Sequence, residues 1–344
     1  MARRYLRASV PGIVEVAERA GVSPATVSRC FNTPTIVRFE TRKKVEEAAE
    51  ALGYVPHATA RALNHGLSGT VGLIVPTIDN AIFSEMVQAF SDTLSRHART
   101  MLICAHGYDL KRETVLVESL LAHDVDALAL VGVKHDEATL QLLERQPVPT
   151  AFVWNYRQRQ PFPCLGVDNR DAGRLATEHL LERGHTEILF QFAEANANDR
   201  AADRRSGALA AAKAAGSSGV DPSRVLTCKY DVDAAKALVL DALERDPKIT
   251  AVLSGNDVMA LGAVFAAAAR GMRVPDDLSI VGVGDFKGSS AVEPGLTTVR
   301  IPAKRIGRHA AEMLIEMIEW PSVEQSGERF APELVLRGST AAVH

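Results

Sequence analysis

Five residues in the segment 24–29 have side chains suited to touching nucleic acid. Arg29 can donate two parallel hydrogen bonds to O6 and N7 of guanine in a major groove. Thr26 and Ser28 suit phosphate oxygens, which fix register without reading sequence. Pro24 and Ala25 offer only apolar contact, for example to the methyl group of thymine. The set predicts base and backbone contacts by one short element, provided that all five side chains point outward.

The flanking residues predict that element, a pair of helices joined by a sharp turn. The first helix has one apolar face, which consists of Ile13, Val14, Val16, Ala17 and Ala20. Gly21 permits the turn, and Ser23 can cap a second helix. The inward positions of the second helix are Val27, Cys30 and Phe31. We interpret the pattern as a helix-turn-helix; the alternative is an αα-hairpin inside a larger helical domain, with Arg29 merely solvated.

A third helix, expected over residues 42–52 with Thr41 as its cap, would complete a small core. The following segment, residues 54–66, has Pro56 to open a helix and several alanines that favour one. Leu63 is a large apolar residue near its end, with no obvious core to join. Composition alone favours a helical linker between domains.

The charge of the 344-residue chain is unevenly distributed. The net charge is −3, with 39 Lys and Arg against 42 Asp and Glu. Residues 1–66 hold ten of the basic and six of the acidic residues, so the head carries +4 and the rest of the chain −7. A small basic head on an acidic body is expected if only the head meets phosphate.

The composition, 47% apolar and 24% charged, is that of a soluble globular protein, and the length predicts two or three domains. Each cysteine lies in an apolar run and is expected to be a buried free thiol: Cys30, Cys104, Cys164 and Cys228. No apolar stretch reaches about 18 residues, and the N-terminus lacks the core of a signal peptide. We therefore expect a cytoplasmic protein with no membrane segment.

From Thr70 onward the pattern alternates between strands and helices. The expected strands are 71–75, 101–105, 126–131, 149–154, 187–192, 225–228, 250–254, 278–283, 296–301 and 332–339. The expected helices are 82–97, 111–122, 137–145, 170–183, 200–215, 232–245, 256–270 and 302–320. Two consecutive series of βαβ units predict two lobes with parallel sheets. A small molecule would bind between them, in the loops after the strands.

The residues that catalysis would need are not in place. Gly282-Val283-Gly284 is a fragment of a dinucleotide-binding fingerprint and follows a late strand. No phosphate-cradling loop or nucleophile elbow occurs in the sequence. His179 and His185 flank a helix end and are expected at the surface, and no histidine pair has metal-ligand spacing. We predict no enzyme, cofactor or metal site; the competing hypotheses are a sugar-binding receptor of the transport class and an enzyme on a doubly wound fold.

Several stretches together make the chain similar to the lactose-repressor family of bacterial transcription regulators. These stretches are VAERAGVSPATVSRCFN, ALGYVPHATARAL, VGLIVPTIDNAIFSE, GRLATEHLLERGH, AVLSGNDVMALGA, RVPDDLSIVGVGDF and PGLTTVRIP. The resemblance extends from Ile13 to Thr340. It implies an effector-responsive regulator, with a repressor as the expected form, that binds a pseudo-palindromic operator in double-stranded DNA as a homodimer.

The resemblance also implies a division of the chain. An all-α helix-turn-helix head would occupy residues 1–55 and a hinge helix or linker residues 56–68. An α/β body of the two-lobed, type I periplasmic-binding-protein class, with parallel sheets, would occupy residues 69–344. The expected N-lobe comprises about 69–166 and 300–325, and the expected C-lobe about 167–298 and 328–340.

In such a family Leu63 becomes a wedge that enters the minor groove at the operator centre, beside the same residue of the partner subunit. An apolar wedge partly unstacks a base step, and the kink admits both heads to adjacent half-sites. A helix this short is marginal alone, so the hinge should form only with DNA and partner. The implied DNA-contacting residues are Ser23, Pro24, Ala25, Thr26, Ser28, Arg29, Asn32, Tyr54, His57, Ala60, Arg61, Leu63 and Asn64.

For the effector, a sugar or sugar acid, the resemblance implies a second set of residues. These are Ile82, Phe83, Trp154, Asn155, Arg204, Tyr230, Asn256, Asp257 and Asp285. Simpler roles stay open: Ile82 and Phe83 as plain core, Asp257 as a helix cap, Arg204 as a surface partner of Asp203 or Asp199. Gly284 stands where many relatives have a first Asp, which leaves Asp285 alone. The stretches HGYD and GVGDF and the position of Trp154 resemble the gluconate-repressor branch and favour a sugar acid.

Overall fold

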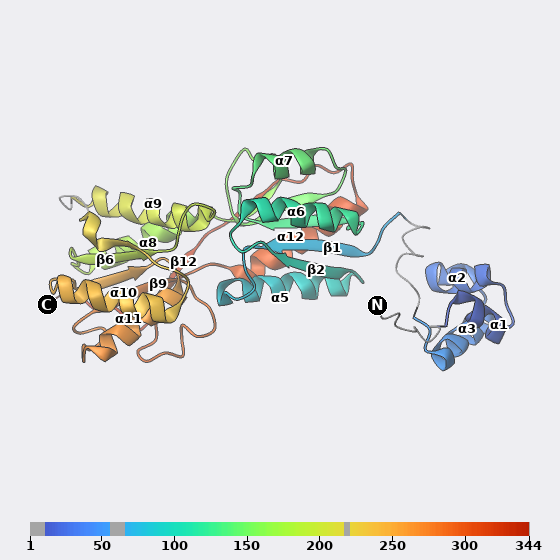
Figure 1. Ribbon diagram of the computed structural model, residues 1–344, viewed down its shortest axis with the longest axis horizontal. Helices are drawn as coiled ribbons and strands as arrows, with labels where there is room; N and C mark the ends of the chain where they lie inside the picture. Colours follow the sequence, from blue (N-terminus) through green and yellow to red (C-terminus); the bar gives the residue numbers. More distant parts are fainter. Residues whose placement is uncertain (1–10, 56–65, 217–220, 344) are drawn as a thin grey trace, which may run out of the picture. The chain divides into compact units, whose positions relative to one another are not determined.

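The computed structural model describes residues 11–55, 66–216 and 221–343, the side chain of Pro34 excepted (Figure 1). The chain divides into two compact units, residues 1–70 and 71–344, and each is described by itself. Residues 56–65 of the expected hinge, among them His57, Ala60, Arg61, Leu63 and Asn64, lie outside the described residues.

The first unit contains three α-helices and one 3₁₀ turn in its described part. They are α1 (Ile13–Ala20), α2 (Pro24–Asn32), η1 (Pro34–Ile36) and α3 (Phe39–Leu52). Gly21 ends α1 with φ 67°, a left-handed conformation that glycine adopts without strain. The Ser23 hydroxyl accepts a hydrogen bond from the Thr26 amide at 3.2 Å, so the predicted cap of α2 is confirmed.

The core of this unit consists of Val16, Ala17, Val27, Cys30, Val45, Ala48 and Ala49. Two expectations need correction. Val14 is 51% exposed, because the apolar face of so short a helix has room for only part of the set. Thr41 is no cap: α3 begins at Phe39, with Arg38 in the cap position and no side-chain cap bond, so Thr41 lies inside the first turn.

The second unit contains two six-stranded sheets, one in each lobe. The first sheet has the order β11-β5-β4-β3-β1-β2. Its strands are β1 (Thr70–Val75), β2 (Thr100–Ala105), β3 (Ala127–Val131), β4 (Thr150–Asn155), β5 (Cys164–Val167) and β11 (Glu328–Phe330). Its helices are α5 (Ala81–Arg96), α6 (Leu110–Ala122), α7 (Glu137–Glu144) and α12 (Ala303–Glu319). Leu73 packs in one core with α5 and α12, whereas its neighbour Ile74 packs in another with α6, because successive strand residues face opposite sides.

The second sheet has the order β12-β10-β9-β8-β6-β7. Its strands are β6 (Ile188–Phe192), β7 (Val225–Thr227), β8 (Ala251–Ser254), β9 (Ser279–Gly284), β10 (Thr297–Arg300) and β12 (Glu333–Val335). Its helices are α8 (Asn169–Glu182), α9 (Asp199–Ala214), α10 (Val232–Arg245) and α11 (Asp257–Ala269), with the 3₁₀ turn η2 (Pro222–Arg224) before β7. Phe190 packs on the α8 and α9 side, and Leu189 on the α10 and α11 side.

Parallel pairing dominates both sheets, as predicted. In the register of the first, Leu73 pairs with Ala129 and Leu130 with Phe152; in the second, Val252 pairs with Ile280. The last strand differs between the lobes, because β11 runs parallel to β5 whereas β12 runs antiparallel to β10.

Three sequence-based expectations for the body were wrong. Residues 328–330, assigned to the C-lobe, form β11 in the first sheet, beside β5, and neither strand was predicted. His179 and His185 are buried rather than at the surface. His179 bonds to Thr340 and His185 to Ala341, since the C-terminal segment covers them.

Two glycines allow α8 and α9 to lie in backbone contact. A Cβ atom on Gly173 would lie 2.0 Å from the Arg204 carbonyl oxygen, and one on Gly207 would lie 2.0 Å from the Arg170 carbonyl oxygen. No larger residue fits at either position without moving one helix. This approach fixes Arg204 against α8. Over the described residues, no helix has the length and apolar content needed to cross a membrane.

Candidate DNA-binding surface and interlobe cavity

The outward face of α2 presents the predicted set of polar and small residues. Ser23, Pro24, Ala25 and Arg29 are exposed, and Thr26, Ser28 and Asn32 are half-buried. The polar members bond to one another within the helix: Ser23 Oγ lies 2.9 Å from Thr26 Oγ1, and Asn32 donates to Ser28 Oγ at 3.1 Å. The Arg29 guanidinium has no ion pair among the described residues. This face is therefore held in shape and open to contact.

Tyr54 lies apart from this face. Its ring centroid is 6.0 Å from that of Phe31, and it packs against the core of the first unit. Burial raises the pKa of its hydroxyl. The structure therefore gives Tyr54 a packing contact, and its expected contact with DNA stays a prediction.

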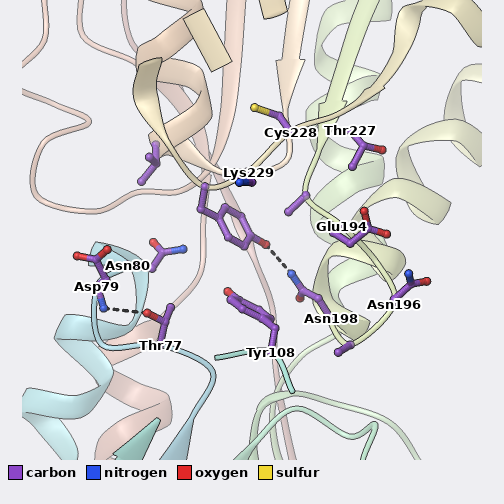
Figure 2. Close-up of a pocket in the computed structure, with 14 residues that line it drawn as sticks. Thr77, Asp79, Asn80, Tyr108, Glu194, Asn196, Asn198, Thr227, Cys228 and Lys229 are labelled. Atoms are coloured by element: carbon purple, nitrogen blue, oxygen red, sulfur yellow. Dashed lines mark hydrogen bonds between the residues drawn. The ribbon is translucent and has the colours of Figure 1, made fainter. Parts of the chain in front are cut away.

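A cavity of about 670 Å³ lies between the two lobes, at the carboxyl ends of four strands (Figure 2). The loops after β1 and β2 supply one wall, and those after β6 and β7 supply the other. The lining residues are Thr77, Asp79, Asn80, Tyr108, Ala193, Glu194, Asn196, Ala197, Asn198, Thr227, Cys228, Lys229, Tyr230 and Val258. The prediction that ligand-sized space follows the strand ends is thus met by these loops.

Two tyrosines from opposite lobes face each other in this cavity. The ring centroids of Tyr108 and Tyr230 are 6.1 Å apart, and the Tyr230 hydroxyl accepts a hydrogen bond from Asn198 Nδ2 at 2.9 Å. Tyr108 has φ 62°, so a non-glycine residue holds a left-handed conformation to direct its ring inward. Burial, and next the neighbouring Tyr230, raise the pKa of Tyr108 well above its ordinary value, which keeps its hydroxyl protonated.

Of the nine residues predicted to contact an effector, only Tyr230 lines this cavity. The other eight do not: Ile82, Phe83, Trp154, Asn155, Arg204, Asn256, Asp257 and Asp285. Ile82, Phe83 and Trp154 belong to the core, where the rings of Phe83 and Trp154 meet edge-on at 4.9 Å. Ile82 and Phe83 lie in the first turn of α5 and Trp154 lies in β4, and all three pack into the core between them.

The polar members of the set are occupied by protein partners. Asn256, not Asp257, caps α11 by accepting from the Val258 amide at 2.8 Å. Asp257 is fully buried and accepts from Ser289, Thr298 and the Asp285 amide. Burial raises the pKa of its carboxyl, although these three donors oppose the shift.

Asp285 forms ion pairs with Arg300 and Arg337, both at 2.7 Å. Arg204 is buried and donates to Asn169 Oδ1 at 2.7 Å and to the Gly255 carbonyl at 2.6 Å. It pairs with neither Asp203 nor Asp199, which had been its simpler alternative. Its recorded partners are neutral, and burial lowers its pKa.

The residues that sequence reasoning missed come from loops with weak patterns. Asn80 caps α5 by accepting from the Ile82 amide at 3.2 Å, so an Asn directly before a helix was the available signal. Tyr108 lies in the stretch HGYD, which had been noted for its resemblance and not for its position. Asn196 and Asn198 precede α9 and had no distinguishing pattern.

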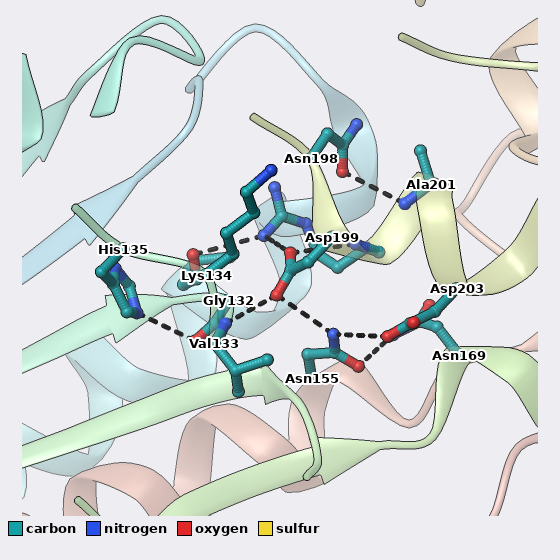
Figure 3. A network of polar contacts seen from close by, with 12 residues as sticks. Gly132, Val133, Lys134, His135, Asn155, Asn169, Asn198, Asp199, Ala201 and Asp203 are labelled. Atoms are coloured by element: carbon teal, nitrogen blue, oxygen red, sulfur yellow. Dashed lines mark hydrogen bonds and ion pairs between the residues drawn. The ribbon is translucent and has the colours of Figure 1, made fainter. Parts of the chain in front are cut away.

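A buried polar network lies beside the cavity and crosses between the lobes (Figure 3). Asp199, the first residue of α9, accepts from the Val133 amide at 2.6 Å and from Asn155 Nδ2 at 3.1 Å. Burial alone would raise the pKa of Asp199, but Arg200 and these donors hold it below its ordinary value. Arg200 also donates to the Val131 carbonyl at 3.3 Å. The carboxylate is thus charged and shared between the lobes.

Several buried donors have no hydrogen-bond partner among the described residues, among them Asn80 Nδ2 in the cavity wall, Trp154 Nε1 and Arg200 Nη2. Buried donors without acceptors are costly, so this region suits a ligand rich in oxygen acceptors. Within the described ranges, no group of three or more His, Cys, Asp or Glu side chains is arranged to hold a metal ion.

Together, a helix-turn-helix unit and a two-lobed body with a ligand-sized cavity define a regulator of transcription that responds to a small molecule. Residues 12–57 match the bacterial regulatory proteins of the lacI family, and residues 177–340 match a periplasmic binding protein-like domain. The chain is 33% identical to the HTH-type transcriptional regulator GntR of Pseudomonas aeruginosa over 96% of each chain. The protein belongs to the lacI family of bacterial transcriptional regulators, as the resemblance predicted.

Solved structures agree in fold. The lac repressor dimer bound to operator and the anti-inducer ONPF is 26% identical, with a TM-score of 0.85 over 96% of this chain and 99% of that chain. The transcriptional regulator CelR in complex with cellobiose is 27% identical, with a TM-score of 0.70 over the same shares. The predicted fold class, a helix-turn-helix head with a two-lobed parallel α/β body, is confirmed.

Proposed function

We propose that this protein is a repressor that binds a pseudo-palindromic operator as a homodimer and is controlled by a sugar or sugar acid in the interlobe cavity. The observation that carries the DNA-binding part is the exposed face of α2, where the Arg29 side chain has no ion pair or hydrogen bond among the described residues. The charge of the head, +4 against −7 for the rest, supports contact with phosphate there. A transport receptor, the alternative, would have no use for such a head.

On the DNA side, we assign base reading to Arg29, with Ser23, Thr26, Ser28 and Asn32 on the backbone and Pro24 and Ala25 against apolar base edges. The roles of Tyr54 and of the residues beyond it, His57, Ala60, Arg61, Leu63 and Asn64, rest on the resemblance. A minor-groove wedge at Leu63 would explain an isolated large apolar side chain in a segment otherwise made of small and polar residues.

On the effector side, the cavity combines aromatic faces with polar groups, as sugar sites do. Tyr108 and Tyr230 suit the apolar face of a sugar ring, and Asn80 and Asn198 suit hydroxyl groups. A carboxylate on the ligand would suit the buried cations Arg200 and Arg204, which lie behind the lining. Arg200 has an unpartnered Nη2 within the described structure, and the recorded partners of Arg204 are neutral.

Dimer formation is supported by the edge of the first sheet. The edge strand β2 exposes Leu102 at 36% and Ile103 at 37% of their surface. An apolar edge strand without cover is a liability that a second copy of the chain would remove. A regulator of this kind works in the cytoplasm, where the DNA is, and we assign it no catalytic role, cofactor or metal.

The DNA-binding part is tested by selection of duplexes from a random pool by the full-length protein. We expect enrichment of a pseudo-palindrome whose binding weakens steeply as salt rises, because bound counterions are released from the phosphates. Enrichment of no sequence would contradict it. The effector part is tested by a thermal-shift screen of sugars, sugar acids and sugar phosphates, since a ligand of the folded state raises Tm by mass action.

A further inference from the structure

We infer that Asn155 and Asp199 form a latch between the lobes that positions residues 196–198, one wall of the cavity, without touching the cavity itself. Neither residue lines the cavity. The inference concerns the arrangement of the lobes, so it is tested without DNA or effector and stands apart from the proposed function. Through this latch, the position of the cavity wall depends on how the two lobes are arranged.

Asp199 belongs to the second lobe, and two of the four hydrogen bonds that its carboxylate accepts come from the first lobe. Its Oδ2 accepts from the Val133 amide at 2.6 Å and from Asn155 Nδ2 at 3.1 Å, both in the first lobe. Its Oδ1 accepts from Arg200 Nη1 at 2.7 Å, and the same guanidinium nitrogen reaches the first-lobe Val131 carbonyl. A charged carboxylate 6% exposed can be retained only where such donors surround it. Separation of the lobes would remove the two donors from the first lobe, the Val133 amide and Asn155 Nδ2.

Asn155 belongs to the first lobe and bonds to side chains of the second lobe. Its side chain is 0% exposed and reaches three side chains of the second lobe. Its Nδ2 donates to Asp199 and Asp203, and its Oδ1 accepts from Asn169 at 3.0 Å. A primary amide is the one neutral group of this size that can donate twice and accept at once.

The latch connects directly to the cavity wall. Asn198 precedes Asp199 and caps α9 by accepting from the Ala201 amide at 3.2 Å, while its Nδ2 donates to the Tyr230 hydroxyl. Asn196 is held from the other side, because Lys134 of the first lobe donates to its carbonyl at 2.6 Å. Residues 196–198 are therefore fixed between two contacts with the first lobe, and their position follows the latch.

The substitution that tests this is Asn155→Asp, which keeps the shape and replaces the donor by a carboxylate. Asp199 and Asp203 would then face a third carboxylate at about 3 Å, a repulsion that partial burial strengthens. The exchanged pair Asn155→Asp with Asp199→Asn restores the donor and the original charge between these two positions, and it leaves the repulsion with Asp203, so the recovery is expected to be partial. A merely structural role would make the double variant worse than either single one.

The experiment measures the distance between spin labels on the two lobes in the full-length protein. Labels at Glu118→Cys on α6 and Glu244→Cys on α10, both exposed positions, report the lobe arrangement. A third position, Asn196→Cys, paired with Glu118→Cys, reports the wall. Cys104→Ser removes the native thiol that is only partly buried, since Cys30, Cys164 and Cys228 are buried.

We expect Asn155→Asp to shift both distance distributions to longer values and to broaden them, and the exchanged pair to return both toward wild type. The matched control is Gln191→Glu, which adds a carboxylate at a fully buried amide whose recorded partners, Ser254 and Met259, lie in its own lobe. It should cost stability and leave both distances unchanged. If Asn155→Asp does not fold, Asn155→Ala replaces it, with a smaller shift in the same direction. Unchanged distances in the folded variants, or no recovery in the exchanged pair, would overturn the latch.

Discussion

The polar face of α2 and the polar network between the lobes contain the same kinds of side chain, but they differ in burial and in the partners of those side chains. On α2, Arg29 is exposed and has no ion pair among the described residues. Between the lobes, Asn155 and Asp199 are buried, and their bonds cross from one lobe to the other. Exposed polar groups contribute little to folding stability and can bind another molecule. Buried polar groups with protein partners contribute to stability and cannot bind another molecule. Substitutions should therefore separate binding from stability.

The largest effect on stability is expected in the polar network between the lobes. Asp199→Ala removes the side-chain acceptor of the Val133 amide and one of the two acceptors of Asn155 Nδ2 and of Arg200 Nη1. Removing one partner of a buried charged pair costs about 3–5 kcal/mol of unfolding free energy, measured by urea denaturation. Asp241→Ala, at an exposed position on α10 with one helical ion pair, is the control and should cost under about 0.5 kcal/mol. Equal losses of unfolding free energy in the two variants would contradict the greater contribution of the buried network to stability.

The next effect is a pH dependence that arises within the second lobe. Burial lowers the pKa of His179 to about 4, helped by the charges of Arg183 and His185. The unfolded chain binds a proton below about pH 6.5 and the folded chain does not, so stability is complete above that pH and is lost as pH falls toward 4. The full loss from this group is roughly 3 kcal/mol.

The variant His179→Asn checks that assignment by urea denaturation at pH 7.5 and pH 5. It should reduce the dependence in this interval, with a remainder from His106 and His185, because burial lowers their pKa values as well. The fall at lower pH that comes from carboxylates such as Asp199 should stay. A profile identical to wild type would contradict the lowered pKa of His179. DNA binding measured at pH 7.5 should not change in this variant, because the substitution lies in the body.

On the recognition face, Arg29→Ala should weaken binding to the selected duplex by about 1–3 kcal/mol, with little change on random duplex. The urea midpoint should match wild type, because the Arg29 side chain has no ion pair or hydrogen bond within the described part of the chain. Lys44→Ala, another exposed basic residue of the head, controls for the change in charge. An equal drop on both duplexes would make Arg29 a phosphate contact instead of a base reader.

Leu63→Ala tests the wedge that the resemblance implies. Affinity for the selected duplex should fall by roughly tenfold, about 1.4 kcal/mol, because the base step at the centre is no longer held open. Stability and effector affinity should stay near wild type. Leu67→Ala, a partly exposed leucine four residues later, serves as the control. Unchanged operator affinity in Leu63→Ala would remove the wedge.

The smallest effect is expected at the cap of α2. Ser23→Ala removes the acceptor of the Thr26 amide and should cost about 1 kcal/mol of stability. Because the first unit is small, the loss should appear in its own unfolding transition, followed by circular dichroism at 222 nm. Because Ser23 is also assigned to the DNA backbone, affinity for the selected duplex should fall as well, and unchanged affinity would contradict that contact.

How much the sequence predicted follows from how local each feature is. The cap at Ser23, the turn at Gly21 and the bounds of most helices depend on neighbours within four residues, and they were confirmed to within one or two positions. Strands β5 and β11 were missed because neither shows a clear strand pattern: β5 follows Pro163 and contains Gly166, and β11 begins with two charged residues. Their pairing joins positions 164–167 and 328–330, which no local pattern connects.

The cavity was harder to predict for the same reason. Its wall combines loops after four strands from two sheets, and Tyr108 and Tyr230 meet only because the lobes face each other. The resemblance implied that Asn155 and Arg204 contact the effector, and neither lines the cavity. Their side chains bond to buried protein groups and do not reach the cavity. These partners come from distant parts of the chain, so no local pattern predicts them.

The measurement that tests the account most directly is the affinity of the wild-type protein for its selected duplex, with and without the compound that gives the largest thermal shift. A regulator that couples the cavity to the head must change that affinity, by about 5–150-fold for a typical coupling free energy, in either direction. Fluorescence anisotropy at fixed salt measures it. Equal affinities at saturating compound, in a protein whose Tm the compound raises, would contradict control of DNA binding from the interlobe cavity.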